Sequence, residues 1–223
     1  MILHHPSTEM LAEYASGALP MSHNLCVATH LEHCPTCQHE YARLNQVGAA
    51  LFDSLAADSG TPNPDEQALK DRIFQQLDSV APIAVSAKPA STQNGIPKAL
   101  RQWIPENYDQ LSWFRLTPAF RLVTLLKDRD GAQIALSRVK PGGRMGHHRH
   151  TGTELTVVLK GAFSDDSGLY KKGDFVVRDA RHRHRPVVTR DAECICLMVT
   201  AAPIQFTGRL TRWLNPLLRW QHG

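Results

Sequence analysis

The apolar residues of this chain follow two different periods, one on each side of a segment rich in proline, alanine and serine. Before residue 80 they recur every three or four positions, which indicates helices, and after residue 98 they form short β-branched runs, which indicate strands. The segment between them, residues 81–97, has neither period and predicts a linker. A length of 223 residues suits two domains. We therefore expect a small all-α domain at 1–80, the linker, and an all-β domain at 98–223.

Three or four short helices are expected in the first domain. Ser7 and Thr8 can cap a helix that runs to Tyr14. Two further apolar stripes have helical spacing: Tyr41, Leu44, Gly48, Leu51 and Leu55, and then Leu69, Ile73, Leu77 and Val80. A domain of about 80 residues buries only about 60–65% of its unfolded surface, so it often needs an additional cross-link.

Short strands at close spacing predict a sandwich or barrel for the second domain. The expected strands begin at Phe120, Gln133, Glu154, Asp174 and Cys194, and turn signals such as Asp130-Gly131 and Lys172-Gly173 separate them. The last segment, residues 206–220, is amphipathic and basic. We expect it to form a helix that packs on the barrel or on a partner.

Charge is distributed unevenly along the chain. Residues 1–80 carry three basic and ten acidic side chains, a net charge of −7, whereas the remaining residues have a net charge of +11. This asymmetry predicts different partners for the two parts.

No apolar run approaches the ~18 residues of a membrane span, and the first six residues lack the features of a signal peptide. Five cysteines, an odd number, fit a reducing cytoplasm and metal or thiol chemistry better than a disulfide scaffold.

A histidine and two cysteines are spaced as metal ligands in the segment 30–37, His-Leu-Glu-His-Cys-Pro-Thr-Cys. Cys34 and Cys37 lie one helical turn apart, Pro35 is a favoured first helical residue, and the positive end of a helix favours thiolates. His30 lies one turn earlier. Three ligands leave a tetrahedral zinc ion one ligand short. The upstream donors that could complete the set are His4, His5, His23 and Cys26.

This pattern, following an N-terminal histidine in a small acidic helical domain, resembles the zinc-binding anti-sigma domain that sequesters extracytoplasmic-function sigma factors. In that family an N-terminal histidine completes a site of two histidines and two cysteines. The His4-His5 pair resembles the ChrR-like subgroup, which implies His5 as the fourth ligand and leaves His4 as the alternative. The resemblance implies a structural zinc ion, whose apparent binding free energy of about 10–16 kcal/mol would decide whether so small a domain folds.

A second group of potential ligands lies in the β half. His148 and His150 alternate on one strand face, and Glu154 follows them, between Gly142 and Gly161. Every element of this spacing matches the first cupin motif. The resemblance therefore implies a cupin, or jelly-roll barrel, with a metal ion inside it.

The second cupin motif is only partly present. Counting from Gly173 leads to His184 as the last ligand, but the expected Pro-x-Gly turn is absent, and His182 is the alternative on the same strand face. Three histidines and a glutamate suit zinc or another divalent transition metal, and the family resemblance favours zinc. Cys194 and Cys196 also share a strand face, so they could be redox-active or could simply line the barrel.

Together, the two motifs and their order resemble ChrR-like anti-sigma factors over nearly the whole chain. The resemblance implies a cytoplasmic regulator, not an enzyme, that binds an extracytoplasmic-function sigma factor and releases it under oxidative stress, from singlet oxygen or organic peroxide. No nucleic acid or membrane partner is expected. The expected partner-binding residues are Leu69, Ile73, Phe74 and Leu77, with core packing as the rival explanation.

Two other functions compete with this prediction. The intact first cupin motif would also suit a metal-dependent enzyme of the dioxygenase or isomerase type, with a regulatory N-terminal domain. The basic cluster between residues 178 and 190 would suit direct DNA binding, although it lacks a recognition-helix pattern.

Overall fold

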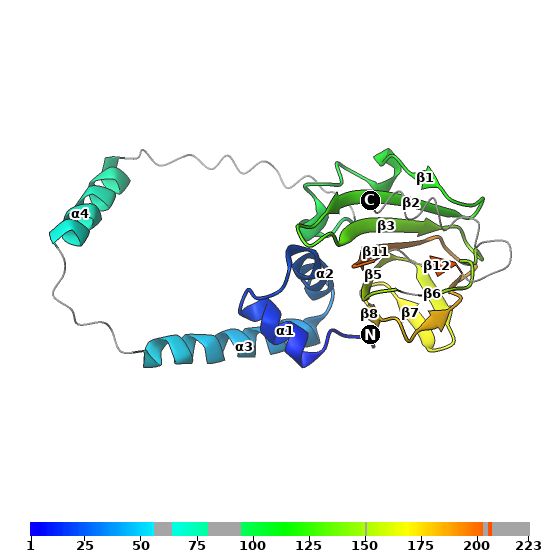
Figure 1. Ribbon diagram of the computed structural model, residues 1–223, viewed down its shortest axis with the longest axis horizontal. Helices are drawn as coiled ribbons and strands as arrows, with labels where there is room; N and C mark the ends of the chain where they lie inside the picture. Colours follow the sequence, from blue (N-terminus) through cyan, green and yellow to red (C-terminus); the bar gives the residue numbers. More distant parts are fainter. Residues whose placement is uncertain (56–63, 80–94, 150, 203–204, 207–223) are drawn as a thin grey trace. The chain divides into compact units, whose positions relative to one another are not determined.

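The computed structural model describes residues 1–55, 64–79, 95–149, 151–202 and 205–206 (Figure 1). Most of the expected linker at 81–97, and the amphipathic segment at 206–220 apart from its first residue, lie outside the described residues. By its contacts the chain forms two compact units, one made of residues 1–47 and 93–223 and the other of residues 48–92. A helical N-terminal region followed by an all-β domain confirms the predicted fold class.

Four α-helices make up the helical region, which we define as residues 1–79. They are α1 (Thr8–Ala15), α2 (Met21–Leu31), α3 (Pro35–Ser54) and α4 (Pro64–Ser79). The Ser7 hydroxyl accepts a hydrogen bond from the backbone N–H of Met10 at 3.2 Å, so it caps α1 as predicted. Pro35 is the first residue of α3, where its missing N–H costs no helical hydrogen bond.

The β domain, which we define as residues 98–206, has twelve described strands and two short 3-10 helices, η1 (Lys98–Leu100) and η2 (Tyr108–Gln110). The strands are β1 (Phe114–Arg115), β2 (Phe120–Lys127), β3 (Gln133–Val139), β4 (His148–Arg149), β5 (Glu154–Lys160), β6 (Ala162–Asp165), β7 (Gly168–Lys171), β8 (Phe175–Arg178), β9 (Arg183–His184), β10 (Val187–Val188), β11 (Cys194–Thr200) and β12 (Gln205–Phe206).

These strands pair antiparallel in three sheets. The main sheet has the order β1-β2-β3-β11-β5-β8, and two smaller sheets have the orders β10-β6-β7 and β12-β4-β9. The crossover that places β11 between β3 and β5 brings distant parts of the sequence together in the centre of the sheet (Figure 1). The five strands expected from the sequence are β2, β3, β5, β8 and β11.

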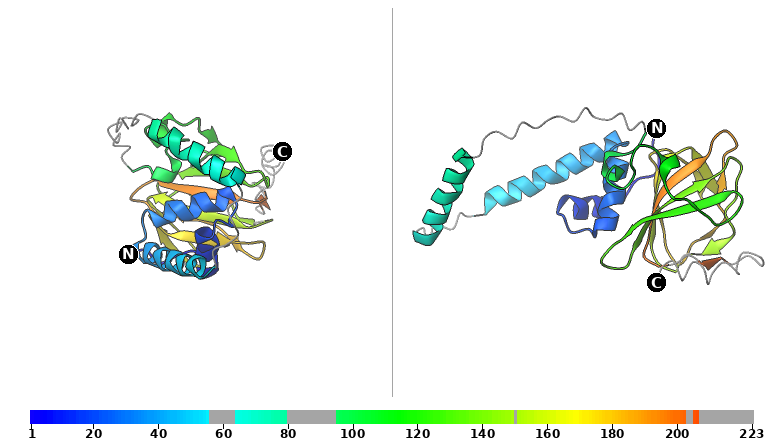
Figure 2. Two further views of the ribbon diagram at one scale, coloured as in Figure 1. Left: turned by 90° about the vertical axis from the view of Figure 1, so that its left-hand side faces the viewer. Right: turned by 90° about the horizontal axis from the view of Figure 1, so that it is seen from above.

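The central strands of the main sheet are buried on both faces. Helix α2 packs against β5 and β11 on one face (Figure 2), and residues of β6, β7 and β10 pack against the other. On β11, Ile195 and Leu197 belong to the same core as the α2 residues Leu25 and Val27. The alternate residue Met198 packs instead with the interior of the β domain. Burial on both faces explains why residues 194–199 read as an unbroken apolar run.

Polar contacts also join the helices to the β domain within the first unit. The carboxylate of Glu32 accepts hydrogen bonds from the backbone N–H groups of Lys98 and Ala99 at 2.8 and 2.9 Å, which caps η1. The carboxylate of Asp128 accepts one from the N–H of Ser22, near the start of α2, at 2.9 Å. Residues 1–47 are therefore held to the β domain by both apolar and polar contacts.

Candidate metal centres

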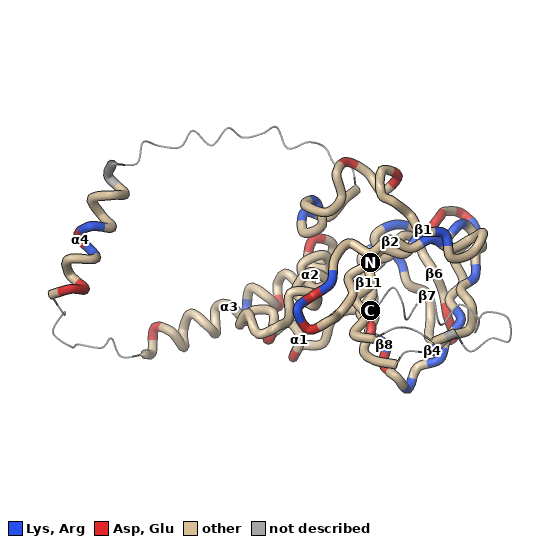
Figure 3. Tube along the Cα trace, turned by 45° about the horizontal axis from the view of Figure 1, so that its top comes forward, with Lys and Arg blue, Asp and Glu red and all other residues tan. Residues whose placement is uncertain are grey.

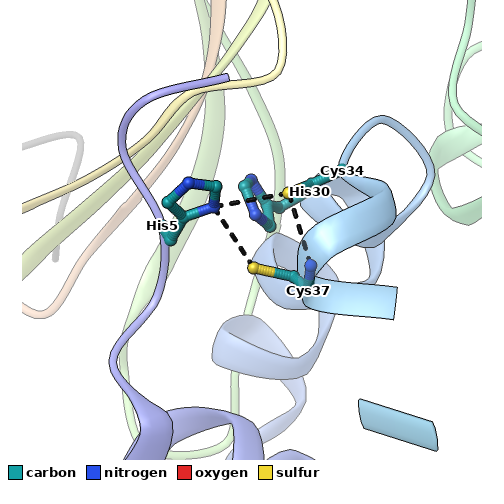
Figure 4. A group of neighbouring side chains, drawn as sticks. All are labelled: His5, His30, Cys34 and Cys37. Atoms are coloured by element: carbon teal, nitrogen blue, oxygen red, sulfur yellow. Dashed lines mark hydrogen bonds between the residues drawn. The ribbon is translucent and has the colours of Figure 1, made fainter. Parts of the chain in front are cut away.

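Four side chains from three segments meet near the start of the chain, and we call them the N-terminal cluster: His5, His30, Cys34 and Cys37 (Figure 4). One potential ligand atom from each lies within 4.8 Å of all the others. The Nδ1 atom of His5 is 3.3 Å from each of the two sulfurs. His4 lies elsewhere, with its ring centroid 4.5 Å from that of Tyr170.

Local structure explains how the two cysteines converge. Cys34 directly precedes α3 and Cys37 lies in its first turn, so both sulfurs lie at the positive end of the helix. The backbone N–H of Cys37 is directed at the Cys34 sulfur at 3.5 Å. His30 lies in the last turn of α2, and only a few residues separate α2 from α3. The backbone N–H of Cys34 donates a hydrogen bond to the backbone carbonyl of His30 at 3.1 Å.

The imidazole of His30 is oriented as a metal ligand. Its Nδ1 lies 2.7 Å from the carbonyl oxygen of Gly173, and because a carbonyl can only accept, Nδ1 carries the proton. The other ring nitrogen, Nε2, is buried and has no hydrogen-bond partner among the described residues. Burial lowers the pKa of His30 to about 4, so the ring is neutral with a lone pair on Nε2, as metal binding requires.

The Cys37 thiol of the cluster resists ionisation unless a cation lies beside it. Burial, followed by the hydrogen bond with Cys34, raises the pKa of the Cys37 thiol to about 12. A metal ion at this point would offset that penalty, because it binds the thiolate form directly. Two nitrogen and two sulfur donors form a set that zinc prefers, and these four residues could hold a metal ion.

Three of the predicted ligands line one pocket inside the β domain, and we call them the cupin site: His148, Glu154 and His184. His148 on β4 and His184 on β9 are register partners, and their Nε2 atoms are 3.0 Å apart. Glu154, at the start of β5, is 5% exposed and lines the same pocket. The predicted ligand His150 lies outside the described residues.

The structure distinguishes His184 from its alternative. His184 is 7% exposed and faces the pocket, whereas the His182 ring is half-buried and hydrogen-bonded with the carboxylate of Asp179 at 2.8 Å. The rest of the pocket is mainly apolar, and Cys194 and Cys196 belong to its lining, with their sulfurs 3.6 Å apart. Their mutual hydrogen bond and burial raise the pKa of the Cys196 thiol.

The predicted partner-binding residues lie on α4 and are exposed. Leu69, Ile73, Phe74 and Leu77 have exposed fractions of 48%, 47%, 57% and 62%, so core packing does not account for them among the described residues. The second half of α3, together with the residue that follows its end, has an equally exposed set, which we call the α3 set: Val47, Leu51, Phe52 and Leu55. In both helices the four residues have the same spacing, i, i+4, i+5 and i+8, which places them on one helix face.

The apolar stripe in the sequence contains Leu51 and Leu55, but its period alone does not identify the α3 set as a binding surface. Only the first part of that stripe is partly buried, at Tyr41 and Leu44, which pack against the core. The signal that could have revealed the set is the repeat of the α4 spacing in α3.

Comparison with known proteins identifies the family. The anti-sigma-E factor ChrR of Cereibacter sphaeroides is 32% identical over 222 residues, which cover 98% of this chain and 99% of the relative. Residues 104–204 match the sequence model of the ChrR cupin-like domain. None of the described helices is long and apolar enough to cross a membrane.

A solved structure has the same fold over most of the chain. It is the crystal structure of Rhodobacter sphaeroides SigE in complex with the anti-sigma ChrR, with a TM-score of 0.72 and 28% identity, and it covers 90% of this chain and 99% of the matched chain. The predicted family and cupin fold are confirmed, and the competing enzyme function is not supported. The chain belongs to the ChrR family of anti-sigma factors, which are regulatory proteins and not enzymes.

Proposed function

We propose that this protein is an anti-sigma factor whose helical region binds an extracytoplasmic-function sigma factor and blocks its access to core RNA polymerase. The observation that carries the proposal is the exposed apolar set on each of α3 and α4. Large apolar side chains that no core covers are typical of binding surfaces, and buried apolar contacts supply most of the binding energy. The solved relative is itself a complex of ChrR with the sigma factor SigE.

The charge of the helical region supports the same partner. Residues 1–55 contain five acidic side chains and one basic side chain, Arg43. Figure 3 colours the acidic positions of the described chain red and the basic positions blue. Sigma factors carry basic surfaces for DNA, so an acidic helical region can compete for them. Complementary charge mainly accelerates association and excludes wrong partners.

The N-terminal cluster is proposed to hold a structural zinc ion through His5, His30, Cys34 and Cys37. When bound, zinc would supply a cross-link between the segment before α1, the end of α2 and the start of α3. The protein would then keep the start of α3 in a fixed position relative to the end of α2. We retain residues 1–80 as the proposed functional domain, 81–97 as linker and 98–223 as the cupin domain.

The β domain is proposed to bind zinc or another divalent transition metal through His148, His150, Glu154 and His184, and to promote release of the sigma factor under oxidative stress. Contacts reach from this site toward the N-terminus. The carboxylate of Asp165 accepts from His184 Nδ1 at 2.7 Å and from the Arg178 guanidinium at 3.0 Å. The same guanidinium donates to the Tyr170 hydroxyl at 2.6 Å, and the Tyr170 ring contacts that of His4.

Co-purification tests the proposal. The full chain is co-expressed with each extracytoplasmic-function sigma factor of its own organism, and one of them is expected to co-purify at a 1:1 ratio and to lose activity with core polymerase. We expect this to occur in the cytoplasm, without nucleic acid or membrane as a partner. Failure of the zinc-loaded chain to capture any such sigma factor would contradict the proposal.

A further inference from the structure

The N-terminal segment before α1 is attached to one turn of the β domain. The buried carboxylate of Asp174 accepts hydrogen bonds from the backbone N–H groups of Leu3 and His4 at 2.9 and 3.2 Å. The backbone N–H of Phe175 donates to the His4 carbonyl at 3.0 Å. These three bonds fix the backbone immediately before His5, whose imidazole belongs to the N-terminal cluster.

The same turn also holds the second histidine of the cluster. The carbonyl of Gly173 accepts the hydrogen bond from His30 Nδ1, which leaves Nε2 as the free donor atom for a metal. Gly173 has φ +93°, and a Cβ added there would lie 2.6 Å from Ile2 Cδ1 and 3.1 Å from His33 Cβ. Only glycine therefore permits both this backbone conformation and the close approach of the N-terminal residues.

The turn itself is internally braced. The second oxygen of the Asp174 carboxylate accepts a hydrogen bond from the backbone N–H of Lys171 at 2.7 Å, and the N–H of Gly173 donates to the Val158 carbonyl at 2.8 Å. The Asp174 side chain is thus satisfied on both oxygens by backbone donors, two of them in the N-terminal segment and one in the turn. A buried carboxylate held in this way is costly to disturb.

We propose that the turn between β7 and β8, residues 171–175, is a positioning element through which the β domain holds the two histidine ligands of the N-terminal cluster. The two cysteines are positioned by α3, so the site is complete only when the β domain holds the two histidines opposite them. Groups that orient metal ligands from outside the coordination shell commonly change metal affinity 10–100-fold. The inference rests on the metal-binding part of the proposed function.

Cobalt binding to the full-length chain tests the proposal. Cobalt(II) bound by thiolates has charge-transfer absorption that histidine and carboxylate ligands do not produce, so this signal reports the cysteine-containing site. Asp174→Asn replaces one carboxylate oxygen, which accepts a hydrogen bond from a backbone N–H, with an amide N–H that cannot accept it. Gly173→Ala adds a Cβ that would displace Ile2 and His33. Both are expected to weaken cobalt binding at this site about 10–100-fold and to accelerate its loss to a chelator. Asp166→Asn, an exposed change in the β6–β7 turn, is the control and should leave both measurements unchanged.

A double variant separates positioning from general loss of stability. In a His5→Ala background the N-terminal segment carries no ligand, so adding Asp174→Asn should reduce cobalt affinity much less than it does in the unmodified chain. An equal reduction in both backgrounds, or unchanged affinity in Asp174→Asn, would overturn the inference. Absence of the thiolate signal in the unmodified chain would instead refute the proposed metal site itself.

Discussion

The Nε2 atoms of His148 and His184 lie 3.0 Å apart inside the β domain, and both rings are held from the opposite side by an oxygen. His148 Nδ1 lies 2.9 Å from the Gly146 carbonyl, and His184 Nδ1 lies 2.7 Å from the Asp165 carboxylate. With Nδ1 protonated on each ring, both Nε2 atoms direct a lone pair to the same point. A shared metal ion would accept both lone pairs, and this convergence supports the proposed metal in the cupin site.

Removal of His184 is expected to empty the cupin site. His184→Ala deletes one of the two converging imidazoles, so the metal content of the purified chain should fall by about one ion per chain while the N-terminal cluster keeps its own. Elemental analysis of the purified protein measures this. His182→Ala is the matched control, because that ring is held by Asp179 outside the pocket, and it should retain full metal content. Equal loss in both variants would contradict the assignment.

Removal of Cys34 is expected to release the N-terminal metal and to abolish sigma-factor binding. Cys34→Ala leaves three donors and forfeits much of the apparent binding free energy of about 10–16 kcal/mol that a structural zinc ion supplies. Zinc content, far-UV circular dichroism and co-purification with the sigma factor measure the consequences. The exposed residue His39 on α3 supplies the control, since His39→Ala removes an imidazole that is not part of the cluster. Full sigma binding by zinc-free Cys34→Ala would refute a structural role for the metal.

Polar substitution on the exposed helix faces is expected to weaken sigma-factor binding without destabilising the fold. Phe52 and Phe74 are 74% and 57% exposed, so Phe52→Ser and Phe74→Ser remove little buried surface in the free protein. Each should nevertheless lower affinity about 10- to 100-fold, because aromatic side chains at the centre of an interface carry much of its energy. Isothermal titration gives the affinity and thermal unfolding gives the stability. The exposed α4 substitution Gln75→Ala should alter neither.

Tyr170→Phe is expected to weaken the response to oxidative stress and to leave sigma binding intact. The substitution removes only the hydroxyl that accepts from Arg178, whose guanidinium also pairs with the Asp165 carboxylate beside His184. If these contacts transmit a change at the cupin site, release of the sigma factor after singlet oxygen or peroxide should slow several-fold, since such couplings are typically worth about 1–3 kcal/mol. A reporter gene controlled by the sigma factor gives the rate. Unaltered release would exclude this route.

An ion-pair network on the β domain predicts a pH-dependent contribution to stability. Burial alone would raise the pKa of Glu193, but its hydrogen bonds with Arg138 and Lys160 outweigh this and lower the pKa below its ordinary value. A carboxyl with a depressed pKa contributes stability above its unfolded-state pKa, and the contribution disappears as pH falls through the folded-state value. Glu193→Gln should therefore cost about 1 kcal/mol at pH 7 and progressively less below about pH 4. Urea unfolding at both pH values measures this, and a difference that does not depend on pH would contradict it.

The sequence by itself was sufficient to predict features that depend on residues close together along the chain. The Ser7 cap, the start of α3 at Pro35, and the placement of Cys34 and Cys37 on one helical turn all depend on contacts within a few positions. The strands β3, β5 and β11 were recognisable from their β-branched runs. Such patterns specify the local period, because backbone hydrogen bonding and side-chain direction repeat at 3.6 or 2 residues.

Only the tertiary structure decided which of two equivalent neighbours enters a site. His5 lies in the N-terminal cluster, and the backbone just before it is hydrogen-bonded to Asp174, a residue 170 positions along the chain from His4. His184 lies in the pocket of the cupin site and is the register partner of His148. Tertiary packing likewise decided that α2 is buried on the sheet while the apolar faces of α3 and α4 are exposed. Periodicity shows that a face is apolar, but what covers that face depends on long-range contacts, which no local pattern encodes.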